Sequence, residues 1–305
     1  MTTVGRFTAD AMDQALEAIA NRLGVTNRDA RLLQLTNNAV YALPDVGLVV
    51  RITRSNELRD RVDKVVRLAT WFADVDAPSV RLAGPEEQPV VVSALAATVW
   101  RYLPPAEPAP TVEDLGRVLR ELHGLGTPPI PLPAWDPVDD ARRRLADAEA
   151  LDDNDREFLI GWCDRLEPQL AALIRRTQNV LVHGDAHVGN LLRDEHGRVV
   201  LCDFDATCVG PRQVDLAAVP VGEARFGRAG VHRGLADAYG YDVTLDPDWP
   251  LFREARELKM IVAAVPLLAS TPGAAEEFAV RLRSIVSADV HARWTPFADL
   301  HVRQR

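Results

Sequence analysis

The spacing of apolar positions changes once along the chain, and this change predicts two differently built parts. Over residues 9–22 apolar side chains recur at helical spacing, which is typical of an amphipathic helix. Short apolar runs at 31–35, 39–43 and 47–53, separated by turn residues, predict strands. A second helical stripe ends near Asp74, with Ser55 or Asn56 as its candidate N-cap. Further β-rich pieces are expected at 79–82, 89–93 and 98–103.

The second part of the chain is mostly helical. Four prolines between residues 104 and 110 form a stiff connector, so we expect an N-terminal lobe over residues 1–103 and a C-terminal lobe over 104–305. Helices are predicted at 112–125, at 138–150, at 154–176 and from about Gln213 onward. Together the two patterns indicate an α+β fold, with a small β-rich lobe and a larger helical one.

One β-like island, residues 179–202, interrupts the helical part. Within it, Asp194-Glu195-His196-Gly197 reads as a turn between two apolar runs, so the island should contain a hairpin. If the turn is centred between Glu195 and His196, Asn190 lies opposite Leu201. Asp203 then emerges from the same open end of the hairpin.

The side chains at this open end suit a hard cation. An amide oxygen and a carboxylate are ligands that Mg²⁺ accepts, with phosphate oxygens and water completing its shell. Asp185 stands five residues before Asn190, and Asp203 thirteen after it. The spacing matches the phosphoryl-transfer template D-x-x-x-x-N followed by a metal-binding aspartate, in which the first aspartate accepts a hydroxyl proton.

Composition and charge exclude several other classes of protein. The formal charge of −9 argues against broad nucleic-acid binding and is compatible with a neutral or cationic small-molecule partner. No run of about 18 apolar residues predicts a membrane span, and the N-terminus lacks an apolar signal region. Three scattered cysteines suit a reduced, cytoplasmic chain without a disulfide framework.

These motifs resemble the aminoglycoside phosphotransferase family, also called the phosphotransferase enzyme family. The resemblance covers most of the chain and is most specific at His183-Gly184-Asp185-Ala186-His187-Val188-Gly189-Asn190 and at Asp203-Phe204-Asp205. It implies a bilobal protein-kinase-like fold. It further implies a Mg²⁺-dependent kinase that transfers the γ-phosphate of ATP or GTP to a hydroxyl of an aminoglycoside-like antibiotic or another small alcohol. Such an enzyme would be a monomer or a homodimer, with a role in antibiotic resistance or in metabolism.

The resemblance also implies roles for individual residues. Asp185 would be the catalytic base, and Asn190 and Asp203 the Mg²⁺ ligands. Asp215 looks like the buried aspartate that braces the catalytic loop. The residues that resemble the nucleotide site are Val49, Arg51, Trp100 and Tyr102, of which the last two would offer backbone hydrogen bonds to adenine. Two supporting residues remain: His183 should hydrogen-bond within its loop, and Asp205 should bind the metal or cap a turn.

The chain departs from the family's pattern at the nucleotide site. Arg51 stands where many kinases have lysine, and the helix position expected to carry its glutamate partner aligns with Val65. Asp63, Asp60 or Glu57 could replace that glutamate, or Arg51 could lack an acidic partner. A glycine-rich G-x-G-x-x-G flap is also missing.

Two alternative functions therefore stay open at this point. The missing glutamate is compatible with a non-catalytic module that binds nucleotide without transferring phosphate. His183, Asp185 and His187 alternate along the chain and could instead bind zinc in a hydrolase.

Overall fold

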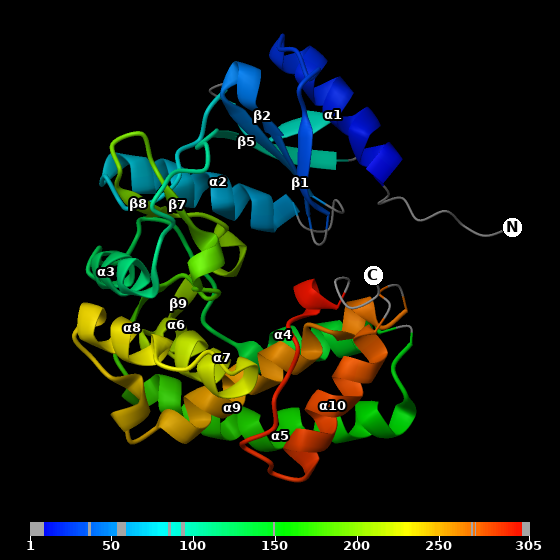
Figure 1. Ribbon diagram of the computed structural model, residues 1–305, viewed down its shortest axis with the longest axis vertical. Helices are drawn as coiled ribbons and strands as arrows, with labels where there is room; N and C mark the ends of the chain where they lie inside the picture. Colours follow the sequence, from blue (N-terminus) through cyan, green and yellow to red (C-terminus); the bar gives the residue numbers. More distant parts are fainter. Residues whose placement is uncertain are drawn as a thin grey trace, which may run out of the picture. The chain divides into compact units, whose positions relative to one another are not determined.

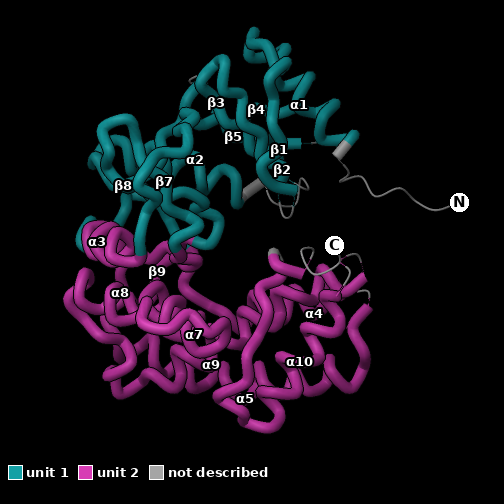
Figure 2. The backbone as a smooth tube through the Cα atoms, viewed as in Figure 1, with its two compact units in different colours: residues 1–111, 124–132, 188–206 teal, residues 112–123, 133–187, 207–305 magenta. Residues whose placement is uncertain are grey.

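The computed structural model describes residues 9–35, 38–53, 59–84, 87–92, 95–148, 150–269, 271 and 273–300 (Figure 1). The chain divides into two compact units, each built from separate stretches (Figure 2). Unit 1 consists of residues 1–111, 124–132 and 188–206, and unit 2 of residues 112–123, 133–187 and 207–305. The candidate cap residues Ser55 and Asn56 lie outside the described part.

Unit 1 contains a five-stranded antiparallel sheet in the order β1-β2-β3-β5-β4. Its strands are β1 (Arg31–Leu35), β2 (Asn38–Leu43), β3 (Leu48–Thr53), β4 (Val90–Val92) and β5 (Leu95–Arg101). Helices α1 (Ala9–Leu23) and α2 (Arg59–Asp74) belong to the same unit (Figure 2). The apolar runs of the sequence thus predict the sheet and both helices.

The alternation of side chains along β3 determines which residues face the core. Val50 and Ile52 lie in the buried cluster that also contains Met12 and Leu16 of α1, so α1 covers one face of the sheet. Arg51 alternates with these residues and therefore projects from the opposite face. The sheet thereby presents a cation on a largely apolar strand.

The predicted hairpin is present, and it packs within unit 1. Strands β7 (Leu191–Arg193) and β8 (Val199–Leu201) pair antiparallel. Backbone hydrogen bonds at 2.8–2.9 Å join Leu201 to Pro78 and Val80. These bonds tie the hairpin to unit 1, which also includes residues 104–111 and 124–132.

The register of the hairpin corrects the expected one by one residue. Leu191 pairs with Leu201, which places Asn190 beside Cys202 rather than Leu201. The cause is the turn, in which Asp194 bonds to Arg198 and Gly197 takes a φ of +79°. A three-residue loop with glycine in the left-handed region is centred on His196, not between two residues.

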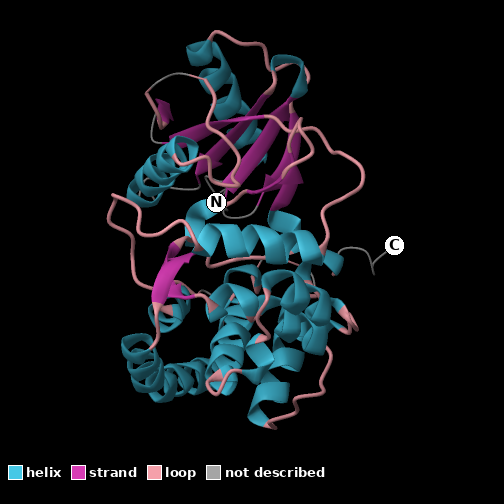
Figure 3. Cartoon of the chain, turned by 90° about the vertical axis from the view of Figure 1, so that its left-hand side faces the viewer, coloured by secondary structure: helices cyan, strands magenta, loops and turns pink. Residues whose placement is uncertain are grey.

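Unit 2 is predominantly helical (Figure 3). Its helices are α3 (Val112–His123), α4 (Pro137–Ala146), α5 (Asp153–Arg176), α6 (Gln213–Leu216), α7 (Ala218–Phe226), α8 (Val231–Tyr239), α9 (Trp249–Val262) and α10 (Ala274–Val286). The main apolar core of this unit gathers side chains from α4, α5, α9 and α10, with Trp162 among its largest buried members. No helix in the described ranges is long and apolar enough to cross a membrane.

Two strand predictions need correction. Residues 79–82 form isolated bridges to Leu201 and Trp100 rather than a strand, because this segment passes between the hairpin and the sheet. In unit 2, β6 (Asn179–Val182) pairs with β9 (Cys208–Pro211), where the sequence pattern indicates no strand. Four residues that end in proline are too few to show an alternating pattern.

A glycine permits the close crossing of α3 and α8. A Cβ added to Gly116 would lie 2.9 Å from the Leu235 carbonyl oxygen and 2.9 Å from the Ala238 Cβ. We predict that Gly116→Ala lowers the free energy of unfolding by about 1–3 kcal/mol through overpacking. Urea unfolding of the full chain measures the change.

The matched control is Gly161, which lies inside α5 with nothing within 4 Å of an added Cβ. Gly161→Ala should stabilise the chain by about 0.5–1 kcal/mol, since alanine is the better helix former. Equal effects of the two substitutions would contradict the close crossing.

Candidate active site

Unit 1 contributes the two predicted metal ligands. The Cys202 N–H donates to the Asn190 carbonyl oxygen at 3.0 Å, so Asn190 and Asp203 both emerge at the open end of the hairpin. Asp203 has a φ of +65°, a left-handed conformation that aspartate adopts more readily than most residues. Asn190 is buried, whereas the Asp203 side chain is 42% exposed. An amide oxygen and an accessible carboxylate therefore leave the same end of one hairpin.

Phe204 fixes the segment that follows. Its side chain is 1% exposed and lies edge-on to Phe72 of α2, with 5.1 Å between ring centroids. Trp100 of β5 lies on another side, 6.4 Å away between centroids. Because an apolar ring is anchored between them, the flanking carboxylates of Asp203 and Asp205 have a defined direction.

Arg51 forms ion pairs with both of these carboxylates. Its guanidinium donates to Asp205 Oδ1 at 2.8 Å and Oδ2 at 2.5 Å, a two-pronged contact. A further bond reaches Asp203 Oδ1 at 3.1 Å. Burial opposes the charge on Arg51, but the two aspartates overcome it and raise the pKa of the guanidinium. A planar fork bonded at both prongs holds a fixed orientation.

Asp205 is surrounded by donors. Asn38 of β2 donates to its Oδ2 at 3.3 Å, and Lys64 of α2 donates to its carbonyl oxygen at 2.7 Å. Burial would raise the pKa of Asp205, but Arg51 and, more weakly, Arg61 and Asn38 hold it below its ordinary value. The carboxylate is therefore ionised at neutral pH and connects β2 to β3, while the backbone carbonyl of Asp205 bonds to α2.

These contacts decide which acid accompanies Arg51. Asp63 is not among its partners, while Glu57 and the Asp60 side chain lie outside the described part. The hypothesis that Arg51 lacks an acidic partner is wrong, because Asp205 supplies one from after the hairpin. Val65 is buried in the apolar face of α2. The residue of this helix that contacts Asp205 is the cation Lys64 and not a glutamate.

The predicted adenine contacts lie along β5 and just beyond it. Val49 pairs with Trp100 across the sheet, and the Trp100 ring N–H donates to Thr98 Oγ1 at 2.8 Å. The amide of Tyr102 donates to the Gly47 carbonyl at 2.9 Å. An adenine contact at Tyr102 would therefore use groups other than its amide.

Unit 2 contributes the loop that carries Asp185, and Asp215 holds this loop. The carboxylate of Asp215 accepts the N–H of His183 at 2.7 Å and that of Gly184 at 2.8 Å. His123 of α3 lies 3.0 Å from the same carboxylate, and both side chains are buried. Burial opposes ionisation, yet these hydrogen bonds keep the pKa of Asp215 below its ordinary value. A buried anion thereby fixes the backbone directly before Asp185.

Two cations of α9 flank Asp185. Lys259 Nζ lies 2.9 Å and Arg256 Nη1 3.2 Å from Asp185 Oδ1. Lys259 also donates to the Gly184 carbonyl at 2.7 Å. Burial would raise the pKa of Asp185, but Lys259 and Arg256 hold it far below its usual range. Asp185 is thus ionised at neutral pH and can accept a hydrogen bond from a hydroxyl.

The geometry contradicts the zinc interpretation. His183 is fully buried, and its Nδ1 accepts the Asp185 N–H at 3.3 Å. His187 is about half exposed, with its Nε2 4.0 Å from Asp185 Oδ2. Across the described ranges, no three histidine, cysteine, aspartate or glutamate side chains converge as a metal site. His183 packs and bonds inside the loop instead.

Sequence reasoning missed Lys259, Arg256, Lys64 and His123. The sequence does contain a signal for Arg256 and Lys259. Together with Arg253 they recur at every third residue of α9, a helix with many buried positions. Cations at that spacing share one helix face. Which acid they meet depends on tertiary packing, which the sequence pattern does not contain.

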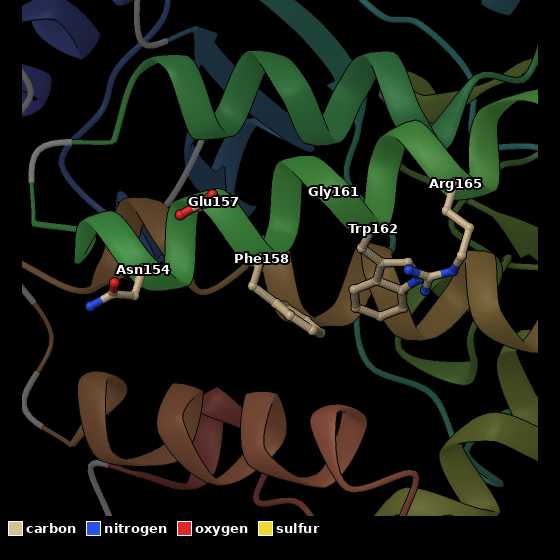
Figure 4. Close-up of a pocket in the computed structure, with 6 residues that line it drawn as sticks. All are labelled: Asn154, Glu157, Phe158, Gly161, Trp162 and Arg165. Carbon is tan, nitrogen blue, oxygen red and sulfur yellow. The ribbon is translucent and has the colours of Figure 1, made fainter.

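A surface hollow in unit 2 is lined by none of the predicted site residues. It encloses about 440 Å³ along α5, where the side chains of Asn154, Phe158 and Trp162 point to the same side of the helix (Figure 4). The Trp162 ring N–H donates to Glu254 at 2.6 Å. The lining of the hollow also includes Glu157, Gly161 and Arg165, and Arg165 pairs with Glu254 at 3.2 Å.

A comparison with protein-family models assigns the chain to a family. Residues 30–255 match the model of the phosphotransferase enzyme family, which is more than half of the chain. The chain belongs to the phosphotransferase enzyme family. The prediction that it is a phosphotransferase is thereby confirmed. No curated protein matches the chain.

Solved structures of several small-molecule kinases resemble the chain in fold. The choline kinase LicA from Streptococcus pneumoniae has a TM-score of 0.66 at 15% identity, over 91% of this chain and 99% of that one. A spectinomycin phosphotransferase has a TM-score of 0.58 at 16% identity, over 93% and 95%. An aminoglycoside-3'-phosphotransferase of type VIII has a TM-score of 0.58 at 20% identity, over 81% and 98%. These likenesses confirm the predicted bilobal α+β fold.

The Asp215 contacts generate a stability prediction. At pH 7, Asp215→Asn should lower the free energy of unfolding by about 3 kcal/mol, because the amide group cannot accept from both N–H donors and His123 loses its anion. Urea unfolding measures this, with the exposed Asp237→Asn of α8 as the control.

The loss of unfolding free energy in Asp215→Asn should become smaller at acidic pH. A lowered folded-state pKa contributes stability that is fully present above the unfolded value of about 3.9 and is lost as the pH falls through the folded value. The difference between wild type and Asp215→Asn should therefore narrow below about pH 4. A difference that widens on acidification would contradict the assigned contacts.

Proposed function

We propose that this protein transfers the γ-phosphoryl group of ATP or GTP to a hydroxyl group of a small molecule, with Mg²⁺ as cofactor. The observation that carries the proposal is Asp185, an ionised carboxylate on a braced loop of a phosphotransferase-family chain, five residues before Asn190. Solved structures with this fold support the proposal. The spectinomycin phosphotransferase was solved with ADP and spectinomycin, and a different protein, APH(2")-IIia, was solved with GDP and kanamycin.

Asp185 would orient the acceptor and receive its proton. The acceptor oxygen forms a bond to the γ-phosphorus while the bond from that phosphorus to the bridging oxygen of the nucleoside diphosphate breaks. The hydroxyl proton passes to Asp185. Since the transition state of phosphoryl transfer is loose, a carboxylate of low pKa serves mainly by positioning the hydroxyl in line with the leaving oxygen.

The hairpin end in unit 1 fits Mg²⁺. Asn190 supplies an amide oxygen and Asp203 an exposed carboxylate, both hard donors, and Mg²⁺ usually takes one or two carboxylates beside phosphate oxygens and water. These two residues would hold the ion, which would neutralise charge on the nucleotide phosphates. Arg51, fixed by Asp205, would contribute a further positive charge toward the same phosphates, with Val49, Trp100 and Tyr102 near the base.

The observation that favoured a non-catalytic nucleotide-binding module has another explanation. This alternative arose because Val65 replaces an expected glutamate, which could leave Arg51 without an orienting acid. Asp205 provides that acid through a two-pronged contact, so the substitution at position 65 leaves Arg51 oriented. A module that only binds nucleotide would also have no use for an ionised acid at position 185.

The role of Asp185 is testable on the purified full chain. We predict that Asp185→Asn lowers kcat by about 10²- to 10⁴-fold while the Kd for nucleotide is largely unchanged. Product formation is followed on any alcohol that supports nucleotide consumption in a library screen, with Asp237→Asn as the charge-matched control. An equal loss of nucleotide binding and turnover would contradict the role.

The metal ligands predict a different signature. Asn190→Ala and Asp203→Asn should raise the Mg²⁺ concentration at half-maximal rate by about tenfold or more, because the first removes an oxygen ligand and the second replaces a carboxylate with a neutral amide. Titration of MgCl₂ at fixed nucleotide measures this, again beside Asp237→Asn. An unchanged Mg²⁺ requirement in both variants would exclude these residues as ligands.

A further inference from the structure

The surroundings of Asp185 carry more positive than negative charge. Arg256 and Lys259 project from α9 to the same oxygen of Asp185. In the part of the chain that the structure describes, Asp185 is the one acid that forms an ion pair with either cation. Two cations meet one anion, and His187 adds a further group that becomes positive on protonation. One cation alone would neutralise the carboxylate, so the second leaves a surplus.

The Arg256 guanidinium has capacity for another partner. It makes one hydrogen bond among the described residues, to Asp185, although arginine has five N–H donors. Its Nε is buried without a partner, so this edge does not lock the side chain. The side chains of Arg256, Lys259 and Asp185 are 18%, 29% and 36% exposed. The group is therefore reachable from outside unit 2.

Two of the acids that the sequence offers for binding an ammonium group have other partners in the fold. The sequence offers acidic pairs at Asp152-Asp153 and Glu276-Glu277 as candidates for such contacts. Asp152 caps α5 by accepting the Asn154 N–H at 2.9 Å. Glu277 is buried and accepts from Arg281 Nε at 2.9 Å and from the Thr295 N–H at 2.8 Å. Neither carboxylate stands beside Asp185.

We propose that the acceptor alcohol carries an anionic group, a carboxylate or a phosphate ester, which Arg256 and Lys259 bind while its hydroxyl lies on Asp185. The inference rests on the proposed function and names its substrate class. The fork of arginine matches both anions in geometry, and lysine adds a point charge. A polycationic acceptor such as an aminoglycoside would instead meet like charges at the base.

A screen on matched sugars tests the charge class. Nucleotide consumption by the full chain is measured with glucuronate, glucose 6-phosphate, glucose and glucosamine, and with a wider set of small hydroxy acids, neutral polyols and amino alcohols. Asp185→Asn reports the background rate. Anionic alcohols should give the highest kcat/KM, and the first two sugars distinguish carboxylate from phosphate. A preference for neutral or amine-bearing alcohols would overturn the inference while leaving the proposed function intact.

Variants of Arg256 test its contact with the acceptor. Arg256→Gln should raise the KM for the preferred anionic acceptor by about 10- to 100-fold, with little change in the KM for nucleotide, and Arg256→Lys should recover part of the loss. Arg165→Gln is the control, since it removes an exposed cation of α5 that pairs with Glu254 of α9. If Arg256→Gln instead lowers kcat equally for all acceptors and raises the KM for nucleotide, the residue contacts the transferred group and the inference is wrong.

A binding measurement separates the two proposals if no alcohol is phosphorylated. Glucuronate, glucose 6-phosphate and glucosamine are titrated into wild type and into an Arg256→Gln, Lys259→Gln double variant, with thermal unfolding as readout. Stabilisation of wild type by an anionic sugar, lost in the double variant, would support the anion site even though phosphotransfer had failed. Stabilisation by glucosamine alone, or by no sugar, would overturn the inference.

Discussion

Ionised carboxylates that are partly or fully withdrawn from water constrain both units of this protein. A charge removed from water needs donors that replace its lost hydration, and each carboxylate here has them. Asp205 has the Arg51 fork and Asn38, while Asp215 has two backbone amides and His123. Asp185 has Lys259 and Arg256. Because hydrogen bonds are directional, satisfying these acids also fixes the loops and side chains that the proposed reaction uses.

Much of the fold could be predicted from the spacing of apolar residues. The period changes between strand and helix, and this located the sheet of unit 1, most helices and the hairpin. The register of the hairpin was displaced by one residue, because a loop of three residues and a loop of four leave the same sequence signature around Gly197. Strand β9 was missed since it is short and pairs with a strand more than twenty residues away.

The residues of the candidate site likewise fall into two groups, those that the sequence predicts and those that only the structure reveals. Asp185, Asn190, Asp203 and Asp215 stand in local motifs, so their residue types and spacing point to them. Lys259, Arg256 and Lys64 come from helices distant in sequence, and nothing in a linear pattern says which acid a helical cation will meet. The residue types that the proposed chemistry uses can therefore be read from local motifs, whereas the charges around them are visible only in the structure. Those charges bear on which acceptor fits.

Unit 1 is assembled from stretches that the ribosome produces far apart in time. Residues 188–206 belong to it, although more than half of the polypeptide has been synthesised before they emerge. Until then Arg51 has neither Asp203 nor Asp205, and Phe72 lacks the ring of Phe204. An N-terminal fragment that ends near residue 111 would hold an unpaired cation and an uncovered apolar edge. Unit 1 is therefore completed only after the hairpin has been synthesised.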